Sequence, residues 1–240
     1  MELDERLLNA CLDYKYLLAR GYKREGALRF VGNRYLLSKA ERLLLYRTVF
    51  SPEEVVERRK KLIHAGVLRG KTALVDGFNV LTTIEAALRG DEIFLCEDGF
   101  VRDLTSVYRR VKINPLTFRA LEEALKALRE LKVGRILMIF DAQVSRSGDL
   151  SSSVNELLKE KGIRGEAFTS KSADSELVRL EGVIMSSDSY IISRAKELFD
   201  LAGHIIRERF KDCKLIDVAK AIREGSRRCL GDFLRESLEG

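Results

Sequence analysis

The chain has 240 residues, of which 45% are hydrophobic and 33% are charged, and its formal net charge is +6 at pH 7. This composition supports a folded core, and the excess of positive charge favours a polyanionic partner such as nucleic acid. The four cysteines show no CxxC or zinc-knuckle spacing, which argues against a disulfide framework and against a zinc site. No run approaches 18 apolar residues and the start is charged and amphipathic, so we expect a soluble, cytoplasmic protein with no membrane partner.

The balance of polar residues favours a thermophilic source. Gln143 is the single glutamine and there are five asparagines, whereas Lys, Arg and Glu are abundant. A bias against thermolabile amides together with many charged residues is typical of proteins from thermophiles.

The first 68 residues predict helices throughout. Helical spacing of apolar residues begins at Leu7 and continues to Gly21, where the first helix should end. The sequence Ser51-Pro52-Glu53-Glu54 combines a capping serine, a proline at the first helical position and a capping-box glutamate. We therefore predict a small all-α domain over residues 1–68, with its later helices at 23–31, 38–48 and 52–64.

From residue 69 to 240 the pattern changes to alternating strands and helices. Strands are expected at 72–75, 135–140, 165–169, 182–187 and 204–209. Helices are expected at 79–88, 115–132, 151–161, 173–180, 189–202 and 215–224. This order predicts an α/β domain with a mainly parallel sheet covered by helices on both faces.

One segment interrupts that alternation. The sequence EIFLCEDGFVRDL, residues 92–104, resembles a β-hairpin that turns at Glu97-Asp98-Gly99. We expect it as an insertion between the first helix of the α/β domain and the next.

Four aspartates follow apolar runs that predict buried parallel strands. They are Asp76 in TALVDGFNV, Asp141 in ILMIFDAQV, Asp174 in FTSKSADSELV and Asp188 in VIMSSDSYI. Ligands of open α/β sheets bind outside the carboxyl ends of the strands, so neighbouring strands would bring the four carboxylates to one edge. Such a cluster predicts a site for Mg²⁺ or Mn²⁺ and metal-assisted phosphodiester hydrolysis.

Asp76 would be the central ligand, because it follows the first strand and precedes Gly77, which allows close backbone approach. Asn79 could orient Asp76 or a phosphate at the start of the next helix. The alternative for each aspartate is a helix cap: Asp188 precedes a helix, and Asp174 lies where the first turn of a helix is expected.

The strings DGFNV, FDAQV, FTSKSADSELVRL and SSDSYIISRA, in this order, resemble the PIN-like nucleases and most closely their NYN branch. The resemblance covers roughly residues 70–210. It implies a three-layer α/β/α sandwich, a divalent metal and endonucleolytic cleavage of RNA. By the same resemblance, Asp76, Asp141, Asp174 and Asp188 would be catalytic metal ligands, with Asn79 and Ser187 in support.

The sequence also departs from that family. Many PIN-like nucleases carry a further helix glutamate near the metal, for which Glu85 is the nearest candidate. The 92–113 segment is not a feature of the family core. The N-terminal helices resemble a family of uncharacterised archaeal proteins instead. A catalytically inactive, RNA-binding or scaffold descendant of the fold is therefore the alternative to a ribonuclease.

Basic residues near aromatic ones are candidates for contact with RNA. Solvated helix faces are the alternative, and the N-terminal helices could equally serve a protein partner or self-association. The candidates are Arg24, Arg29 and Arg34 beside Tyr22, Phe30 and Tyr35, then Arg109, Arg110 and Lys112 after the hairpin, and Lys171 before Asp174.

Other chemistries have little support. The sequence has no GxSxG, Walker A or GxGxxG motif. A haloacid-dehalogenase-type phosphatase needs a second acid two residues after the first, where this chain has Phe78. His64 and His204 are isolated and are expected to be structural.

Overall fold

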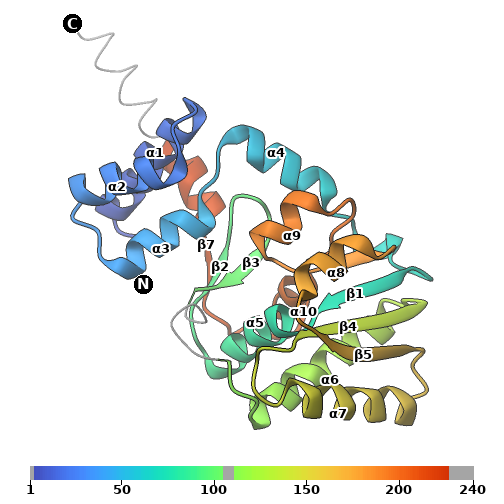
Figure 1. Ribbon diagram of the computed structural model, residues 1–240. Helices are drawn as coiled ribbons and strands as arrows, with labels where there is room; N and C mark the ends of the chain where they lie inside the picture. The colour runs from blue at the N-terminus through green and yellow to red at the C-terminus, as the bar shows by residue number, and fades with distance from the viewer. Residues whose placement is uncertain (1–2, 105–110, 227–240) are drawn as a thin grey trace, which may run out of the picture. The chain divides into compact units, whose positions relative to one another are not determined.

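The computed structural model of the protein (Figure 1) describes residues 3–104 and 111–226. The fold is mixed α/β, with a mainly parallel sheet and a helical N-terminal region. The chain divides into two compact units, and the division is not a single cut near residue 68. The first unit runs to Arg59 and also takes in Phe94–Phe100 and the described residues from Leu215, while the second contains the rest.

The first unit is built on four helices: α1 (Glu5–Ala19), α2 (Arg24–Arg34), α3 (Lys39–Thr48) and α4 (Pro52–Lys61). Asp4 caps α1 by accepting a hydrogen bond from the Leu7 amide at 2.7 Å, and Ser38 and Glu41 form a capping box on α3. The last helix ends at Lys61, three residues before the predicted end.

The second helix continues to Arg34, three residues beyond the end predicted from the sequence. Gly32 is buried, and a Cβ at this position would lie 2.0 Å from an Nη atom of Arg42. The glycine therefore serves close packing of the Arg42 side chain and does not end the helix.

The second unit contains a four-stranded sheet in the order β5-β4-β1-β6. All three strand pairs are parallel. The predicted strands at these four places are confirmed, with bounds β1 (Thr72–Asp76), β4 (Arg135–Asp141), β5 (Gly165–Ser170) and β6 (Val183–Met185). The sheet is mostly apolar because helices cover both of its faces.

Helices α5 (Gly77–Arg89), α6 (Pro115–Glu130), α7 (Ser147–Glu160) and α10 (Leu201–Arg209) share one apolar core with one face of the sheet. On the other side, α8 (Ala173–Arg179) packs against β1, β4 and β5 and contacts the short helix α9 (Ser189–Arg194). Figure 1 shows α6 and α7 on one side of the sheet and α8 and α9 on the other. The α/β/α layering expected from the sequence is therefore present.

The strand predicted at 204–209 is wrong, because this segment is the helix α10. Leu201, Ala202, Ile205 and Ile206 are buried at helical spacing, and the Asp200 carboxylate accepts a hydrogen bond from the Gly203 amide at 2.9 Å. The helix predicted at 189–202 stops at Arg194, and Leu198 pairs in parallel bridges with Ile184 and Leu62 instead. The strand at 204–209 was predicted because Ile205 and Ile206 are adjacent in a short apolar run, and such a run fits a strand as well as a helix.

The predicted hairpin is confirmed. Strands β2 (Ile93–Leu95) and β3 (Val101–Asp103) flank a turn in which the Cys96 amide donates to the Phe100 carbonyl at 2.9 Å. Gly99 has a φ of +91°, a backbone conformation that favours glycine. Near the end of the described chain, β7 (Leu215–Asp217) precedes a helix over 218–226, so the helix predicted from 215 begins three residues later.

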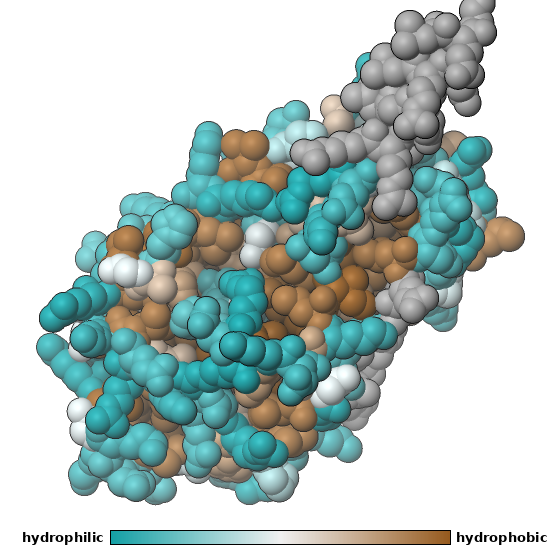
Figure 2. All heavy atoms as spheres, turned by 180° about the vertical axis from the view of Figure 1, so that it is seen from behind, coloured by the Kyte–Doolittle hydropathy of each residue, from teal (hydrophilic) through white to brown (hydrophobic). Residues whose placement is uncertain are grey.

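A 3-10 turn, η1 (Ala65–Val67), precedes β1. Hydrophilic side chains cover much of the face drawn in Figure 2, with apolar patches between them. In the described ranges, no helix has the length and apolar character needed to cross a membrane.

Candidate functional site

The four predicted aspartates all lie at the carboxyl end of the four-stranded sheet. Asp76 and Asp141 are the last residues of β1 and β4, Asp188 directly precedes α9 after β6, and Asp174 is in the first turn of α8, after β5. Because the four strands are parallel neighbours, their carboxyl ends meet along one edge. The sequence prediction of this meeting point depended on that strand order.

The register of the sheet puts the two strand-end aspartates on the same face. Asp76 is opposite Ile139, and Asp141 lies two residues further along β4, so strand alternation turns both side chains the same way. Phe140 points to the opposite face, into the main core, where its ring meets Phe78 with 5.1 Å between centroids. The two carboxylates are therefore on the face covered by α8, which carries Asp174.

Gly77 is needed for this arrangement. A Cβ at Gly77 would lie 2.3 Å from a ring carbon of Phe140 and 3.0 Å from the Ile139 carbonyl oxygen. A side chain here would force the Phe140 ring or the β4 backbone to shift, so glycine allows the chain to turn from β1 into α5 close against β4. Asp76 is the residue directly before Gly77, so it lies at this turn.

Asp76 has a strongly perturbed carboxyl group. The Ser186 hydroxyl donates to its Oδ2 at 2.7 Å, and the Asn79 amide donates to its Oδ1 at 3.4 Å. Burial, which disfavours the charged form, raises the pKa of Asp76 to about 7. The charges of Asp174 and Asp188 also raise this pKa, whereas the two hydrogen bonds lower it.

The other aspartates belong to the same electrostatic group. The pKa of Asp174 is raised first by burial and then by the charges of Asp188 and Asp141. Among residues 3–104 and 111–226, no lysine or arginine forms an ion pair with any of the four. Within the same ranges, no three carboxylate, imidazole or thiol groups converge closely enough to hold a metal ion directly.

Helix capping accounts for part of the role of two aspartates, Asp76 and Asp188, whereas Asp141 accepts a hydrogen bond within a turn and does not cap α7. Asp76 caps α5, and Asp188 caps α9 by accepting from the Tyr190 amide at 2.7 Å and the Ile191 amide at 3.3 Å. Asp141 accepts from the Gln143 amide at 2.8 Å. The bonds of Asp141 and Asp188 use Oδ1 alone, so these hydrogen bonds leave Oδ2 of each carboxylate able to bind a cation.

A buried network holds the end of β6 beside Asp76. The side-chain oxygen of Asn79, Oδ1, accepts a hydrogen bond from the Ser187 backbone amide at 2.8 Å and one from the Ser187 hydroxyl at 3.1 Å. The Arg102 side chain is 1% exposed and donates from Nε to the Ser187 carbonyl at 2.9 Å. Asn79 and Ser187 are thus hydrogen-bonded to each other beside Asp76, and their supporting roles stay a prediction.

Sequence reasoning missed two of the residues in this network. Ser186 binds Asp76, and the Ser-Ser-Asp string could have identified it as readily as Ser187. Nothing in the sequence indicated that Arg102 is buried in this network, because a charged residue in a short hairpin strand is expected to be exposed. Glu85, the candidate for a further helix glutamate, is bound by Arg89 at 3.3 Å and by the Asn114 side-chain amide at 3.4 Å.

The predicted RNA-contacting residues have different environments. Arg24 donates to the Tyr46 carbonyl and to the Val49 carbonyl at 3.0 Å, and its guanidinium lies 4.8 Å from the Phe50 ring centroid, so it has a structural role within the first unit. Arg34 forms an ion pair with Asp13, with 3.6 Å between its Nε and the Asp13 Oδ2. The exposed members of the set are Arg29, Arg34, Lys112 and Lys171, and Arg109 and Arg110 lie outside the described residues.

Comparison with known proteins gives two family matches. Residues 65–204 match the family described as Domain of unknown function (DUF5616), and residues 6–61 match Protein of unknown function (DUF434). The Uncharacterized protein MJ0935 of Methanocaldococcus jannaschii is 41% identical over 196 residues, which is 81% of this chain and 93% of the relative. No solved structure matches.

Proposed function

We propose that this chain, which belongs to the family described as Domain of unknown function (DUF5616), is a metal-dependent endoribonuclease that hydrolyses phosphodiester bonds in RNA. The observation that carries the proposal is the placement of four aspartates at the carboxyl edge of a parallel sheet, without an ion pair to a lysine or arginine in the part of the chain that the structure describes. Their resemblance in order and context to the aspartates of PIN-like and NYN nucleases supports the same activity.

The donor set fits a hard cation. Asp76, Asp141, Asp174 and Asp188 offer carboxylate oxygens, which Mg²⁺ and Mn²⁺ prefer. Magnesium is usually held by one or two carboxylates and keeps several waters, so a site without three converging protein groups still fits it. Asp76 would be the central ligand of such a site, with the other three around it.

The bound cation would supply activation of water and neutralisation of charge on the phosphate. Asp76 is oriented for this role by Ser186 and by the Asn79 amide, which fix both carboxylate oxygens. Its raised pKa shows how unfavourable its charged form is without a counter-charge.

The remaining residues contribute position and charge. Asn79, Ser187 and Arg102 hold the end of β6 against the start of α5. The Ser186 hydroxyl, which donates to Asp76, also accepts from the Asp188 amide at 3.1 Å and so links the two aspartates. Lys171 is exposed three residues before Asp174 and supplies positive charge for an RNA phosphate. The net charge of +6 favours the same polyanionic partner.

The direct test is cleavage of labelled single-stranded and structured RNA by wild type and by Asp76→Asn, with Mn²⁺ or with EDTA. We expect cleavage by the wild type with Mn²⁺, none with EDTA, and a loss of at least about 100-fold in Asp76→Asn. RNA affinity of Asp76→Asn should be unchanged or higher, because one charge that repels phosphate has been removed.

Asp212→Asn is the matched control, because Asp212 is an exposed aspartate of the same unit outside the sheet edge. It should cleave like the wild type. RNA binding by all three proteins without cleavage under any condition would reject the ribonuclease proposal and support the inactive RNA-binding alternative.

A further inference from the structure

A cavity of about 470 Å³ lies where α6 and α7 begin. This volume is within the range of about 300–1,000 Å³ that is usual for small-ligand sites. Its lining includes Ile113, Asn114, Pro115 and Phe118 from the start of α6, and Arg146 and Asp149 from the start of α7. None of these residues takes part in the aspartate network described above.

The apolar part of the cavity carries an exposed aromatic ring. Phe118 is 39% exposed, although phenylalanine is a residue type that folding usually buries. Ile113 and Pro115 line the cavity beside it. An accessible aromatic face with apolar neighbours is the surface on which proteins stack the bases of single-stranded RNA.

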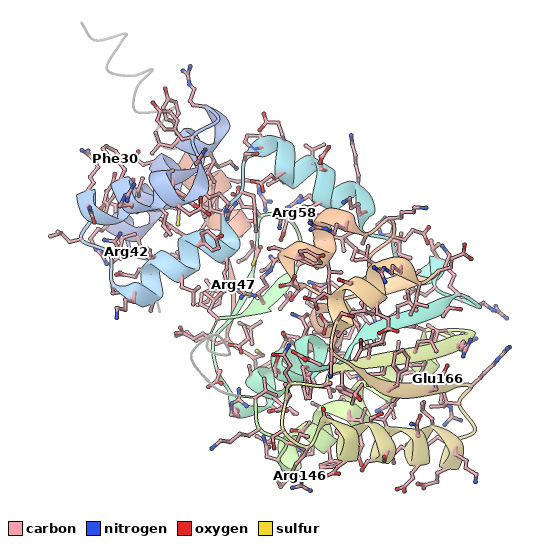
Figure 3. All side chains as sticks on the ribbon, viewed as in Figure 1. Phe30, Arg42, Arg47, Arg58, Arg146 and Glu166 are labelled. Atoms are coloured by element: carbon pink, nitrogen blue, oxygen red, sulfur yellow. The ribbon has the colours of Figure 1, made fainter. Side chains whose placement is uncertain are left out.

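The polar part of the cavity offers a donor and an acceptor side by side. The Arg146 Nε donates to the Asp149 Oδ2 at 2.9 Å, and the two side chains are 71% and 68% exposed. Figure 3 shows Arg146 at the surface at the start of α7. The edge of a nucleobase also presents donors and acceptors side by side, so this pair can bind one.

The cavity is close to the aspartates along the chain. Arg146 is five residues after Asp141, and five extended residues span at most about 18 Å. Two turns shorten the path, because the Val144 amide bonds to the Asp141 carbonyl at 3.2 Å and the Ser147 amide to the Val144 carbonyl at 3.1 Å. A strand of RNA with a phosphate at Asp141 therefore reaches the cavity within a few nucleotides.

We propose that this cavity binds one nucleobase of the single-stranded RNA whose phosphate lies at the four aspartates, by stacking on Phe118 and by contacts of its edge with Arg146 and Asp149. This inference rests on the proposed ribonuclease function and adds the substrate class, which is RNA with unpaired bases. Lys112, exposed next to Ile113, contributes positive charge for the RNA backbone.

The test measures binding in the Asp76→Asn background, where no cleavage is expected. A single-stranded oligoribonucleotide with one 2-aminopurine base is titrated with Mn²⁺ present, and both anisotropy and base quenching are recorded. Phe118→Leu should weaken binding about tenfold and reduce the quenching, because an aliphatic side chain cannot stack on a base. Arg146→Gln should change the relative affinities for oligo-A, oligo-C, oligo-G and oligo-U.

Val67→Ala is the matched control. Val67 is an apolar side chain of the same unit, 49% exposed and in η1, outside the cavity. Its substitution should leave affinity and quenching unchanged. Equal binding by Phe118→Leu and by the parent protein would overturn the cavity proposal, as would the absence of any binding by the Asp76→Asn parent.

The cleavage assay on the wild type separates this proposal from the proposed function. If the wild type cleaves RNA with Mn²⁺ and Phe118→Leu binds like its parent, the base site is wrong and the nuclease stands. If the wild type cleaves nothing but Phe118→Leu loses binding, the nuclease is wrong and the base site stands as part of an RNA-binding protein.

Discussion

In the turn after β2, which belongs to the first unit, the buried carboxylates of Glu97 and Asp98 each form an ion pair with a basic side chain. In the second unit, the four aspartates of the sheet edge form no ion pair with a lysine or arginine among the described residues. Glu97 pairs with Lys15 and accepts from the Phe50 amide, and Asp98, which is fully buried, pairs with Arg58 at 3.1 Å. A buried carboxylate is stable when it is paired and hydrogen-bonded, and costly when it is not.

The pairing of a buried carboxylate with a cation distinguishes a structural acid from a candidate functional one. The turn contains carboxylates whose charges are neutralised within the protein, so nothing further has to bind there. The sheet edge leaves its negative charge uncompensated among the described residues, and a cation would remove that cost. Substitutions should therefore have opposite effects in the two regions.

The largest effect is expected from Arg58→Met, which breaks the turn. It leaves the Asp98 carboxylate buried without this partner and should lower the free energy of unfolding by about 3–5 kcal/mol, measured by urea denaturation. Arg135→Met is the control, because its pair with Glu166 is about half exposed and should contribute at most about 1 kcal/mol. Equal losses in the two variants would contradict the distinction between the regions.

Asp76→Asn should do the reverse in metal-free protein and stabilise it at pH 8, by about 1–3 kcal/mol. The pKa of Asp76 in the folded protein, about 7, is above its usual value. As pH rises between these two values, the unfolded chain releases its proton first, so folding stability falls. Asparagine has no such proton to lose.

The gain should therefore shrink as pH falls from 8 towards 4, which denaturation at a series of pH values would measure. Asp212→Asn, at an exposed carboxylate of the same unit, should show no comparable gain. A gain in Asp76→Asn that is the same at pH 5 and pH 8 would show that it does not come from this titration.

Mn²⁺ should stabilise the wild type, by about 1.4–2.7 kcal/mol at 10 to 100 times its dissociation constant. Protons compete for the same carboxylates, so thermal unfolding should show a larger Mn²⁺ shift at pH 8 than at pH 6. Asp141→Asn and Asp174→Asn should reduce the shift. A shift of equal size in these variants would place the binding of Mn²⁺ elsewhere.

The smallest effect is expected from Ser186→Ala, which removes the hydrogen bond that lowers the pKa of Asp76. Unfolding free energy should fall by about 0.5–1.5 kcal/mol at pH 8. The pKa of Asp76, followed by carbon NMR of its carboxyl group, should rise. Ser193→Ala, at an exposed serine, should leave that titration unchanged; a rise there too would rule out a specific role of Ser186.

Much of the fold could be predicted from the sequence because its signals are local. The strand at Thr72–Asp76 is a short apolar run, and the helix from Pro52 follows a capping serine, so each is specified by its own residues. The segment from Leu201 was predicted wrongly, because a short run with two adjacent isoleucines fits either period and tertiary packing selects the helix.

The site was predicted in part for the same reason. Asp76 and Asp141 follow strands directly, and this position can be read from one sequence. Arg24 looked like an RNA contact because basic and aromatic residues alternate near it, but its partners Tyr46, Val49 and Phe50 are more than 20 residues away. Arg102 gave no signal at all, since its burial depends on the distant Ser187.

Local sequence signals specify the alternation of strands and helices, the four aspartates after apolar runs and the helical start of the chain. Propensity, capping and strand-end position act over a few residues. Tertiary contacts set the strand order β5-β4-β1-β6, the common face of Asp76 and Asp141 and the hydrogen bond from the Ser186 hydroxyl to Asp76. These depend on register and on contacts between residues up to 110 positions apart, which no local pattern encodes.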